Sequence, residues 1–171
     1  DMYINDEFFE KAPEKYDFLK ASKNLNIIYE DENIILCDKK VGILSHPDDN
    51  EYIDTLIGRI KRYLYEKGEY KPDDENSFVP SLVNRIDRNT GGIVIAAKNY
   101  RSLADMNEII RDNYLVKKYL TVTQKPVNGR FTAFLTRNLQ TKKVTVTPSP
   151  VNDESKDIIT VFETLSSKNN L

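Results

Sequence analysis

The stretch that decides the fold is residues 84–98, which read NRIDRNTGGIVIAAK. Its first half is polar and holds Asp87 between two basic residues, Arg85 and Arg88, while its second half is an apolar run. Two glycines between the halves allow the backbone to bend sharply. A polar turn that leads into a short apolar run predicts a loop followed by a buried strand, with Asp87 presented by the loop.

The carboxylate of Asp87 has two interpretations on local grounds. A carboxylate beside guanidinium groups is expected to stay ionised at neutral pH, because opposite charge favours the charged form. An ionised aspartate can act as a nucleophile or a base. Alternatively, Asp87 accepts hydrogen bonds from the backbone of a turn and its arginine neighbours are incidental.

On the N-terminal side of this stretch, the pattern is first strand-like and then helical. Short apolar runs at 27–29 and 34–37 are separated by a polar turn and predict a strand–turn–strand, followed by a further extended piece at 41–47. Residues 52–67 carry apolar side chains at a spacing of three and four, which predicts an amphipathic helix, with Gly68 as its C-terminal cap.

On the C-terminal side, residues 101–112 predict a second amphipathic helix with an apolar, buried side made of Leu103, Met106, Ile109 and Ile110. Segments rich in Thr, Val, Tyr and Phe then predict four strands, at 119–123, 131–136, 143–147 and 158–164. Several short strands with two interspersed helices predict an α+β fold, in which a mixed, largely antiparallel sheet has flanking helices.

Length and composition bound the kind of protein. A chain of 171 residues suits one domain. The first 24 residues lack periodicity and are predicted to be an arm or linker, and 25–171 to be the folded domain. One cysteine and one histidine, Cys37 and His46, exclude a disulfide framework and argue against a zinc site. No apolar stretch approaches the roughly 18 residues that span a bilayer, so we expect a cytoplasmic protein without a membrane partner.

Charge is distributed unevenly along the chain. The net charge is −2, but residues 81–143 carry 12 basic and 4 acidic side chains, whereas residues 1–80 carry 11 and 19. A basic middle segment can present a positive surface to the phosphates of a nucleic acid. Chance segregation of solvated charges predicts the same counts, so charge alone does not decide between the two.

Three segments resemble motifs of the RluA-type pseudouridine synthases. Residues 84–98 resemble the catalytic motif of that family, His-Arg-Leu-Asp-x-x-Thr-Ser-Gly with an apolar run after it. Residues 29–47 are similar to the family's N-terminal hairpin motif, and residues 116–122 to its Lys-x-Tyr-x-Ala motif. Because the three occur in the right order with sensible spacing, the resemblance is specific over about 27–124.

The sequence also departs from the family pattern. The departures are Asn84 for His, Gly91 for Ser, Lys40 for Pro and Thr121 for Ala, and none of them removes a group that the chemistry needs. The family's late motif, Thr-Gly-Arg-x-His-Gln-Ile-Arg, has no counterpart before Leu171. We therefore expect residues 25–171 to be a catalytic domain whose C-terminal part is missing. Residues 1–24 are expected to be an arm or linker, in which residues 1–10 resemble the tail of a preceding RNA-binding domain.

The resemblance implies an isomerase that converts uridine to pseudouridine in structured RNA without a cofactor or a metal, after the base has been flipped out. It implies that Asp87 attacks the anomeric carbon or takes the adjacent sugar proton, at the mouth of a pocket that admits a nucleotide. Arg85 then orients the RNA or fills the gap left by the base, and Tyr119 stacks on the uracil unless it is an ordinary core tyrosine. Further contacts with RNA are expected from Arg88, Asn84, Thr90, Lys117 and Lys118.

The substrate and the alternatives stay open. A monomer that acts on large-subunit ribosomal RNA is expected from the resemblance, with transfer RNA as the other candidate. A non-catalytic RNA-binding fragment is the main alternative in function. A carboxylate-dependent hydrolase is less favoured, because the sequence offers Asp87 no second carboxylate at fixed spacing.

Overall fold

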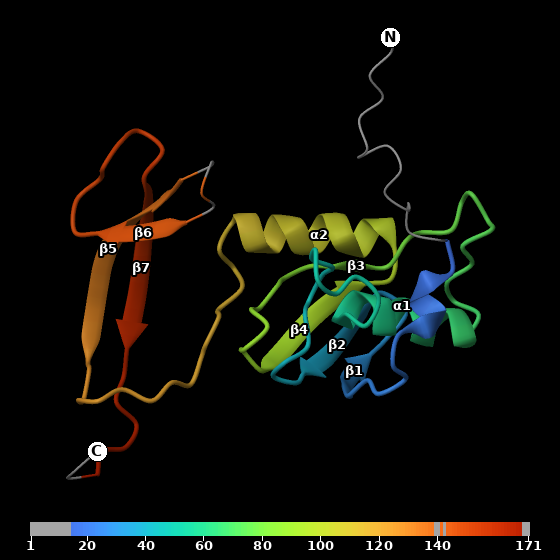
Figure 1. Cartoon of the computed structure of the whole chain (residues 1–171), viewed down its shortest axis with the longest axis horizontal. Helices are drawn as coiled ribbons and strands as arrows, with labels where there is room; N and C mark the ends of the chain where they lie inside the picture. Colours follow the sequence, from blue (N-terminus) through green and yellow to red (C-terminus); the bar gives the residue numbers. More distant parts are fainter. Residues whose placement is uncertain (1–14, 139–140, 142, 169–171) are drawn as a thin grey trace. The chain divides into compact units, whose positions relative to one another are not determined.

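The computed structural model describes residues 15–138, 141 and 143–168 of the chain (Figure 1). The chain divides into two compact units, one ending at Val116 and the other beginning at Lys117. The first unit contains both α-helices and a four-stranded sheet, and the second contains a three-stranded sheet. The boundary lies inside the segment 25–171, whose assignment as one domain stays a prediction.

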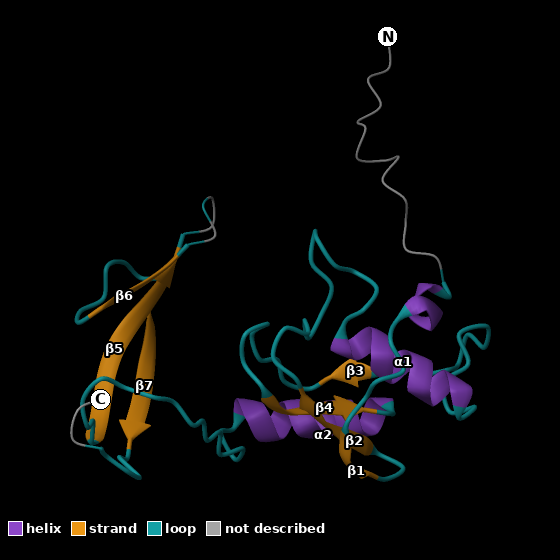
Figure 2. Ribbon diagram, turned by 60° about the horizontal axis from the view of Figure 1, so that its bottom comes forward, coloured by secondary structure: helices purple, strands orange, loops and turns teal. Residues whose placement is uncertain are grey.

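The sheet of the first unit is antiparallel throughout its described strands (Figure 2). Its order is β1-β2-β4-β3. The strands are β1 (Ile27–Glu30), β2 (Ile34–Lys39), β3 (Ser81–Leu82) and β4 (Gly92–Ala97). The register of the central pair runs from Ile34 opposite Ala97 to Lys39 opposite Gly92. Together with the helices, this sheet confirms the predicted α+β fold.

Two capped helices lie on opposite faces of this sheet (Figure 2). Helix α1 (Leu56–Glu66) begins after Thr55, whose side chain accepts a hydrogen bond from the backbone N of Gly58. Helix α2 (Tyr100–Arg111) begins after Asn99, whose side chain accepts a hydrogen bond from the backbone N of Ser102. The prediction that the first helix starts at residue 52 was wrong. The carboxylate of Glu51 accepts hydrogen bonds from the backbone N of Ile53 and of Asp54, and these bonds form a turn before the helix.

The core of the first unit lies between α1 and the sheet. It combines alternate residues of β2 and β4 with one side of α1, namely Ile35, Cys37, Val94, Ala96, Leu56, Ile60 and Leu64. Phe18, from the 3-10 helix Asp17–Lys20, joins this core, and its ring centroid lies 5.6 Å from that of Tyr65. The described part of the predicted arm is therefore packed on the first unit, while residues 1–14 lie outside the described residues.

Helix α2 is less buried than its pattern predicted. Its apolar residues Leu103, Met106, Ile109 and Ile110 are only half-buried. The buried residue of this helix is Ser102, whose hydroxyl donates to the carbonyl oxygen of Asn33 at 2.8 Å. A polar contact to the β1–β2 turn thus fixes the start of the helix, while its apolar side stays partly open to solvent.

The second unit is a three-stranded antiparallel sheet with β5 (Gly129–Arg137) at its centre. Its neighbours are β6 (Val144–Thr147) and β7 (Lys156–Phe162), which confirms three of the four predicted strands. The prediction of a strand at 119–123 was wrong, because these residues are exposed and make no strand pairing. High strand propensity needs a partner and a buried face to take effect.

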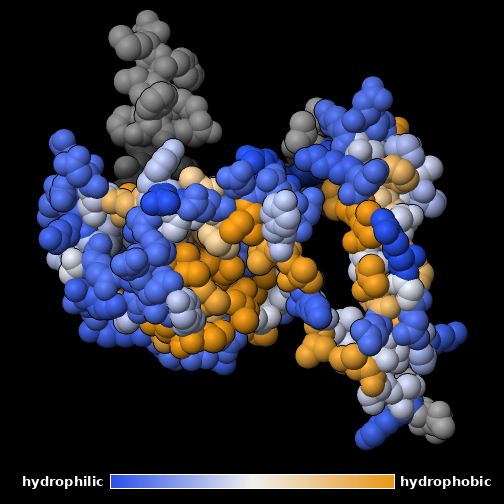
Figure 3. All heavy atoms as spheres, turned by 180° about the vertical axis from the view of Figure 1, so that it is seen from behind, coloured by the Kyte–Doolittle hydropathy of each residue, from blue (hydrophilic) through white to orange (hydrophobic). Residues whose placement is uncertain are grey.

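Exposed apolar side chains occur on both units (Figure 3). Ile28 and Ile93 are examples in the first unit, and Phe131 and Val161 in the second. Neither helix of the described ranges is long and apolar enough to cross a membrane.

Candidate active site

Asp87 lies in the loop that joins β3 to β4. The backbone N of Thr90 donates to the carbonyl oxygen of Asp87 at 3.0 Å, which closes a turn directly after the aspartate. The Asp87 side chain is exposed, so its carboxylate can be approached from solvent. The loop sits at the end of the sheet where Lys39 is paired with Gly92.

Hydrogen bonds pin the loop on both sides of Asp87. Ser45 is buried, and its hydroxyl donates to the carbonyl oxygen of Ile86 at 2.7 Å. The backbone N of Gly42 donates to the carbonyl oxygen of Arg88 at 2.8 Å, and Arg88 Nε donates to the carbonyl oxygen of Gly42 at 3.1 Å. Gly42 has a φ of 92°, which other residues rarely adopt. The residues before and after the carboxylate are therefore both fixed.

A buried lysine lies beneath this loop. Lys39 is 1% exposed, and its Nζ donates to the carbonyl oxygen of Ile43 at 2.7 Å and, at 3.4 Å, to that of Arg88. Burial lowers the pKa of the Lys39 ammonium, and the negative charge of Asp87 opposes that shift. Lys39 is thus a buried cation on which the charge of the candidate carboxylate acts. Sequence reasoning gave it no role.

The flanking arginines do not hold Asp87 as expected. Among the described residues, no ion pair joins Asp87 to Arg85 or Arg88. Arg88 is engaged with a backbone carbonyl of the neighbouring loop. Arg85 is exposed, and its charge acts on His46. The two arginines next to Asp87 in the sequence therefore interact with other residues and not with Asp87.

Asn84 continues the pairing of β3 with β4. Its Oδ1 accepts from the backbone N of Ile95 at 2.8 Å, and its Nδ2 donates to the carbonyl oxygen of Ile93 at 3.4 Å. The amide therefore supports the first residues of the loop. Its predicted contact with RNA stays a prediction, as does that of the half-buried Thr90.

The predicted site residues fall on both units. The loop of the first unit brings together Asp87, Arg85, Arg88, Asn84 and Thr90. Lys117, Lys118 and Tyr119 are exposed residues at the start of the second unit. The proposed role of Tyr119 beside Asp87 therefore stays a prediction.

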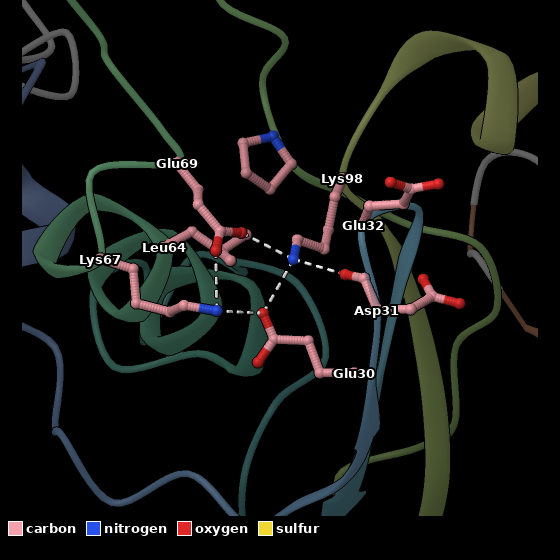
Figure 4. A pocket seen from close by; sticks show the side chains of 8 residues that line it. Glu30, Asp31, Glu32, Leu64, Lys67, Glu69 and Lys98 are labelled. Carbon is pink, nitrogen blue, oxygen red and sulfur yellow. Dashed lines mark hydrogen bonds and ion pairs between the residues drawn. The ribbon is translucent and has the colours of Figure 1, made fainter.

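A hollow in the first unit lies at the opposite end of the sheet, beside Lys98 and Glu30 (Figure 4). Its wall carries a ring of alternating charges, in which Lys98 lies 2.8 Å from Glu30 and 2.6 Å from Glu69, and Lys67 lies 2.8 Å and 2.7 Å from the same two carboxylates. Because every charge is paired, this ring is structural. A second hollow beside Ser102 also lies at that end. The predicted pocket at Asp87 therefore stays a prediction.

Comparisons with known proteins show the family to which the chain is similar. The family model described as RNA pseudouridylate synthase matches residues 33–171. The chain is 38% identical over 146 residues to an uncharacterized RNA pseudouridine synthase of Mycoplasma genitalium, covering 83% of this chain and 44% of that protein. It is 31% identical over 140 residues to the ribosomal large subunit pseudouridine synthase D of Borreliella burgdorferi, covering 79% of this chain and 42% of that protein.

Solved structures show the same fold. Human RNA pseudouridylate synthase domain containing 4 superposes with a TM-score of 0.59 at 17% identity, covering 84% of this chain and 54% of that chain. The chain spans about half the length of the curated relatives it matches.

Proposed function

Because this chain belongs to the RluA-type family of RNA pseudouridine synthases, we propose that Asp87 is the carboxylate with which it converts uridine to pseudouridine in RNA. The observation that carries the proposal is the exposed Asp87 on a loop pinned through Ile86 and Arg88. A fixed backbone on both sides limits where the carboxylate can point, which lowers the entropic cost of reaching the reactive geometry.

The proposed reaction needs no added reactant. The bond between the anomeric carbon and the ring nitrogen breaks, a bond from the same carbon to a ring carbon forms, and that ring carbon loses a proton while the nitrogen gains one. Asp87 serves either by attacking the anomeric carbon or by removing the adjacent sugar proton. A flipped-out base is required for both, because a stacked uridine cannot present its sugar to a side chain.

Other residues of the chain supply binding and orientation. Arg85 is exposed and has no ion-pair partner among the residues described, so its guanidinium is available to the RNA near the flipped nucleotide. Tyr119 is 62% exposed, and we assign it to stacking on the uracil, a contact worth about 1–3 kcal/mol per base. Lys117 and Lys118 are assigned to phosphates.

We assign large-subunit ribosomal RNA as the substrate, because several relatives are named as ribosomal large subunit pseudouridine synthases. We place the enzyme in the cytoplasm as a monomer. Transfer RNA as the substrate, and an RNA-binding role without catalysis, are alternatives that the same experiment separates.

The test compares the complete wild-type protein with Asp87→Asn on unmodified ribosomal and transfer RNA transcripts. Mass tagging of pseudouridine is expected to show product on ribosomal RNA with the wild type and none with Asp87→Asn. Asp105→Asn, the same change at an exposed site on α2, is the matched control and is expected to remain active. Full activity of Asp87→Asn would end the assignment. Binding of RNA without product in the wild type would favour the non-catalytic role.

A further inference from the structure

One basic side chain on α1 differs from the others in having no acidic partner. Lys61 is half-buried, and it makes no hydrogen bond or ion pair with any described residue. Burial alone accounts for the lowered pKa of its ammonium. The other basic residues of the helix and its C-cap are each paired with a carboxylate, Arg59 with Asp54, Arg62 with Glu66 and Lys67 with Glu30.

The position of Lys61 is set by a junction of three segments. The backbone N of Ile57, one helical turn before Lys61, donates to the carbonyl oxygen of Ser45 at 3.3 Å. The hydroxyl of Ser45 donates in turn to the carbonyl oxygen of Ile86 at 2.7 Å. The positive charge of Lys61 acts on the imidazole of His46, the residue after Ser45, so Lys61 lies near this junction.

Two further nitrogen-bearing side chains flank this junction. His46 follows Ser45, and Arg85 precedes Ile86. Burial lowers the pKa of the His46 imidazole, and the positive charges of Arg85 and Lys61 lower it further. The imidazole is therefore neutral at pH 7 and has a ring N–H to donate. The charges of Lys61 and Arg85 thus both act on a neutral donor, and neither side chain forms an ion pair with a carboxylate of the described residues.

We propose that Lys61, together with His46 and Arg85, binds a phosphodiester group of the RNA next to the nucleotide that reaches Asp87. A half-desolvated cation without a counter-ion favours an anionic ligand, because the ligand replaces the lost hydration. The proposal rests on the proposed function, since that function brings RNA to the Asp87 loop. Lys61 is then a positioning residue that fixes the strand, not a group that touches the reacting atoms.

The test measures how salt affects binding of the chain to an unmodified large-subunit ribosomal RNA transcript. Each phosphate contact that is lost lowers the steepness of log K against log of the KCl concentration by about 0.7–1. Lys61→Gln and Lys61→Met are each expected to show this decrease, whereas Lys61→Arg is expected to keep the wild-type slope. Lys71→Gln removes the same charge from an exposed lysine in the loop after α1, and it is the control that should leave the slope unchanged.

The outcomes separate this proposal from the catalytic one. With the complete protein, the neutral Lys61 variants are expected to raise KM while kcat stays near that of the wild type. Asp87→Asn is expected to lose product but to keep the salt slope. A wild-type slope in folded Lys61→Gln and Lys61→Met would overturn the phosphate site and leave the role of Asp87 intact. No RNA binding by the wild-type chain would overturn both.

Discussion

Replacement of Glu30 by glutamine perturbs the ring of charges at the far end of the sheet. Burial raises the pKa of the Glu30 carboxyl, but hydrogen bonds from Lys67, Lys98 and Tyr63 lower it more, to about 2 from its usual 4.5. This lowering corresponds to about 3 kcal/mol, at about 1.4 kcal/mol for each tenfold change in proton affinity. Because Lys67 is partly exposed to screening solvent, we expect Glu30→Gln to lower the free energy of unfolding by about 2 kcal/mol at neutral pH.

The sign of the pH dependence follows from the direction of the pKa shift. A carboxyl whose pKa is depressed in the folded state stabilises the protein above its unfolded pKa, and it loses that contribution as the pH falls through the folded pKa. The difference in unfolding free energy between the wild type and Glu30→Gln is therefore full at pH 7. It is expected to shrink steadily as the pH is lowered from 4.5 towards 2.

Urea unfolding followed by the helical circular dichroism signal is a suitable assay, because both helices belong to the first unit and the chain has no tryptophan. Glu66→Gln makes the same change at a carboxylate that is 43% exposed and pairs with Lys23 and Arg62. That control is expected to cost about 0–1 kcal/mol. Equal losses for the two variants at pH 7, or a Glu30→Gln difference that persists undiminished at low pH, would refute the reasoning.

Two further substitutions test the supports of the site and of α1. Ser45→Ala removes the buried hydroxyl that donates to the carbonyl oxygen of Ile86. We expect it to lower the free energy of unfolding in urea by about 1–2 kcal/mol and to slow pseudouridine formation. Ser81→Ala, at a half-buried hydroxyl, is the control that should leave the unfolding free energy and the rate unchanged. Gly58→Ala places a Cβ against the carbonyl oxygen of Ile53, closer than van der Waals contact allows. We therefore expect a lower melting temperature and a loss of about 1–3 kcal/mol in the free energy of unfolding, despite the higher helix propensity of alanine. An unchanged melting temperature would contradict the packing.

Local patterns predicted most elements of the fold. The apolar runs at 27–29, 34–37 and 93–97 became strands because each is short and lies beside a turn. Three- and four-residue spacing predicted both helices, and only the start of α1 was misplaced. The first residue of a helix depends on which residue caps it. Here the turn formed by the side chain of Glu51 holds residues 52–54 outside helix α1.

The exposed segment 119–123 failed as a strand for a different reason. Its Thr, Val and Tyr content is typical of strands, but strand formation depends on a hydrogen-bonding partner that the segment itself does not encode. In the second unit the central strand β5 already pairs on both sides, with β6 and β7. Composition therefore predicted the propensity of this segment and not its pairing.

The residues that hold the Asp87 loop in place could not be predicted from the sequence around Asp87, because they lie far from it in the chain. Lys39 reaches the loop only through the β2–β4 register that places it opposite Gly92. One signal was available, since residues alternate across a strand and Lys39 follows Ile35 and Cys37 on their buried side. A lysine at a core-facing position at the end of a strand is a candidate for a specific role.

The same geometry explains why the two arginines form no ion pair with Asp87 among the described residues. The sequence places Arg85 and Arg88 near Asp87, yet the charge of Arg85 acts on His46 and Arg88 donates to Gly42. The charge of Asp87 acts instead on Lys39, 48 positions earlier. The charge around the candidate carboxylate is therefore a property of the folded first unit and not of its local sequence. It follows that substitutions in the 39–46 segment, which supports the loop that carries Asp87, should slow turnover even though they leave the motif itself unchanged.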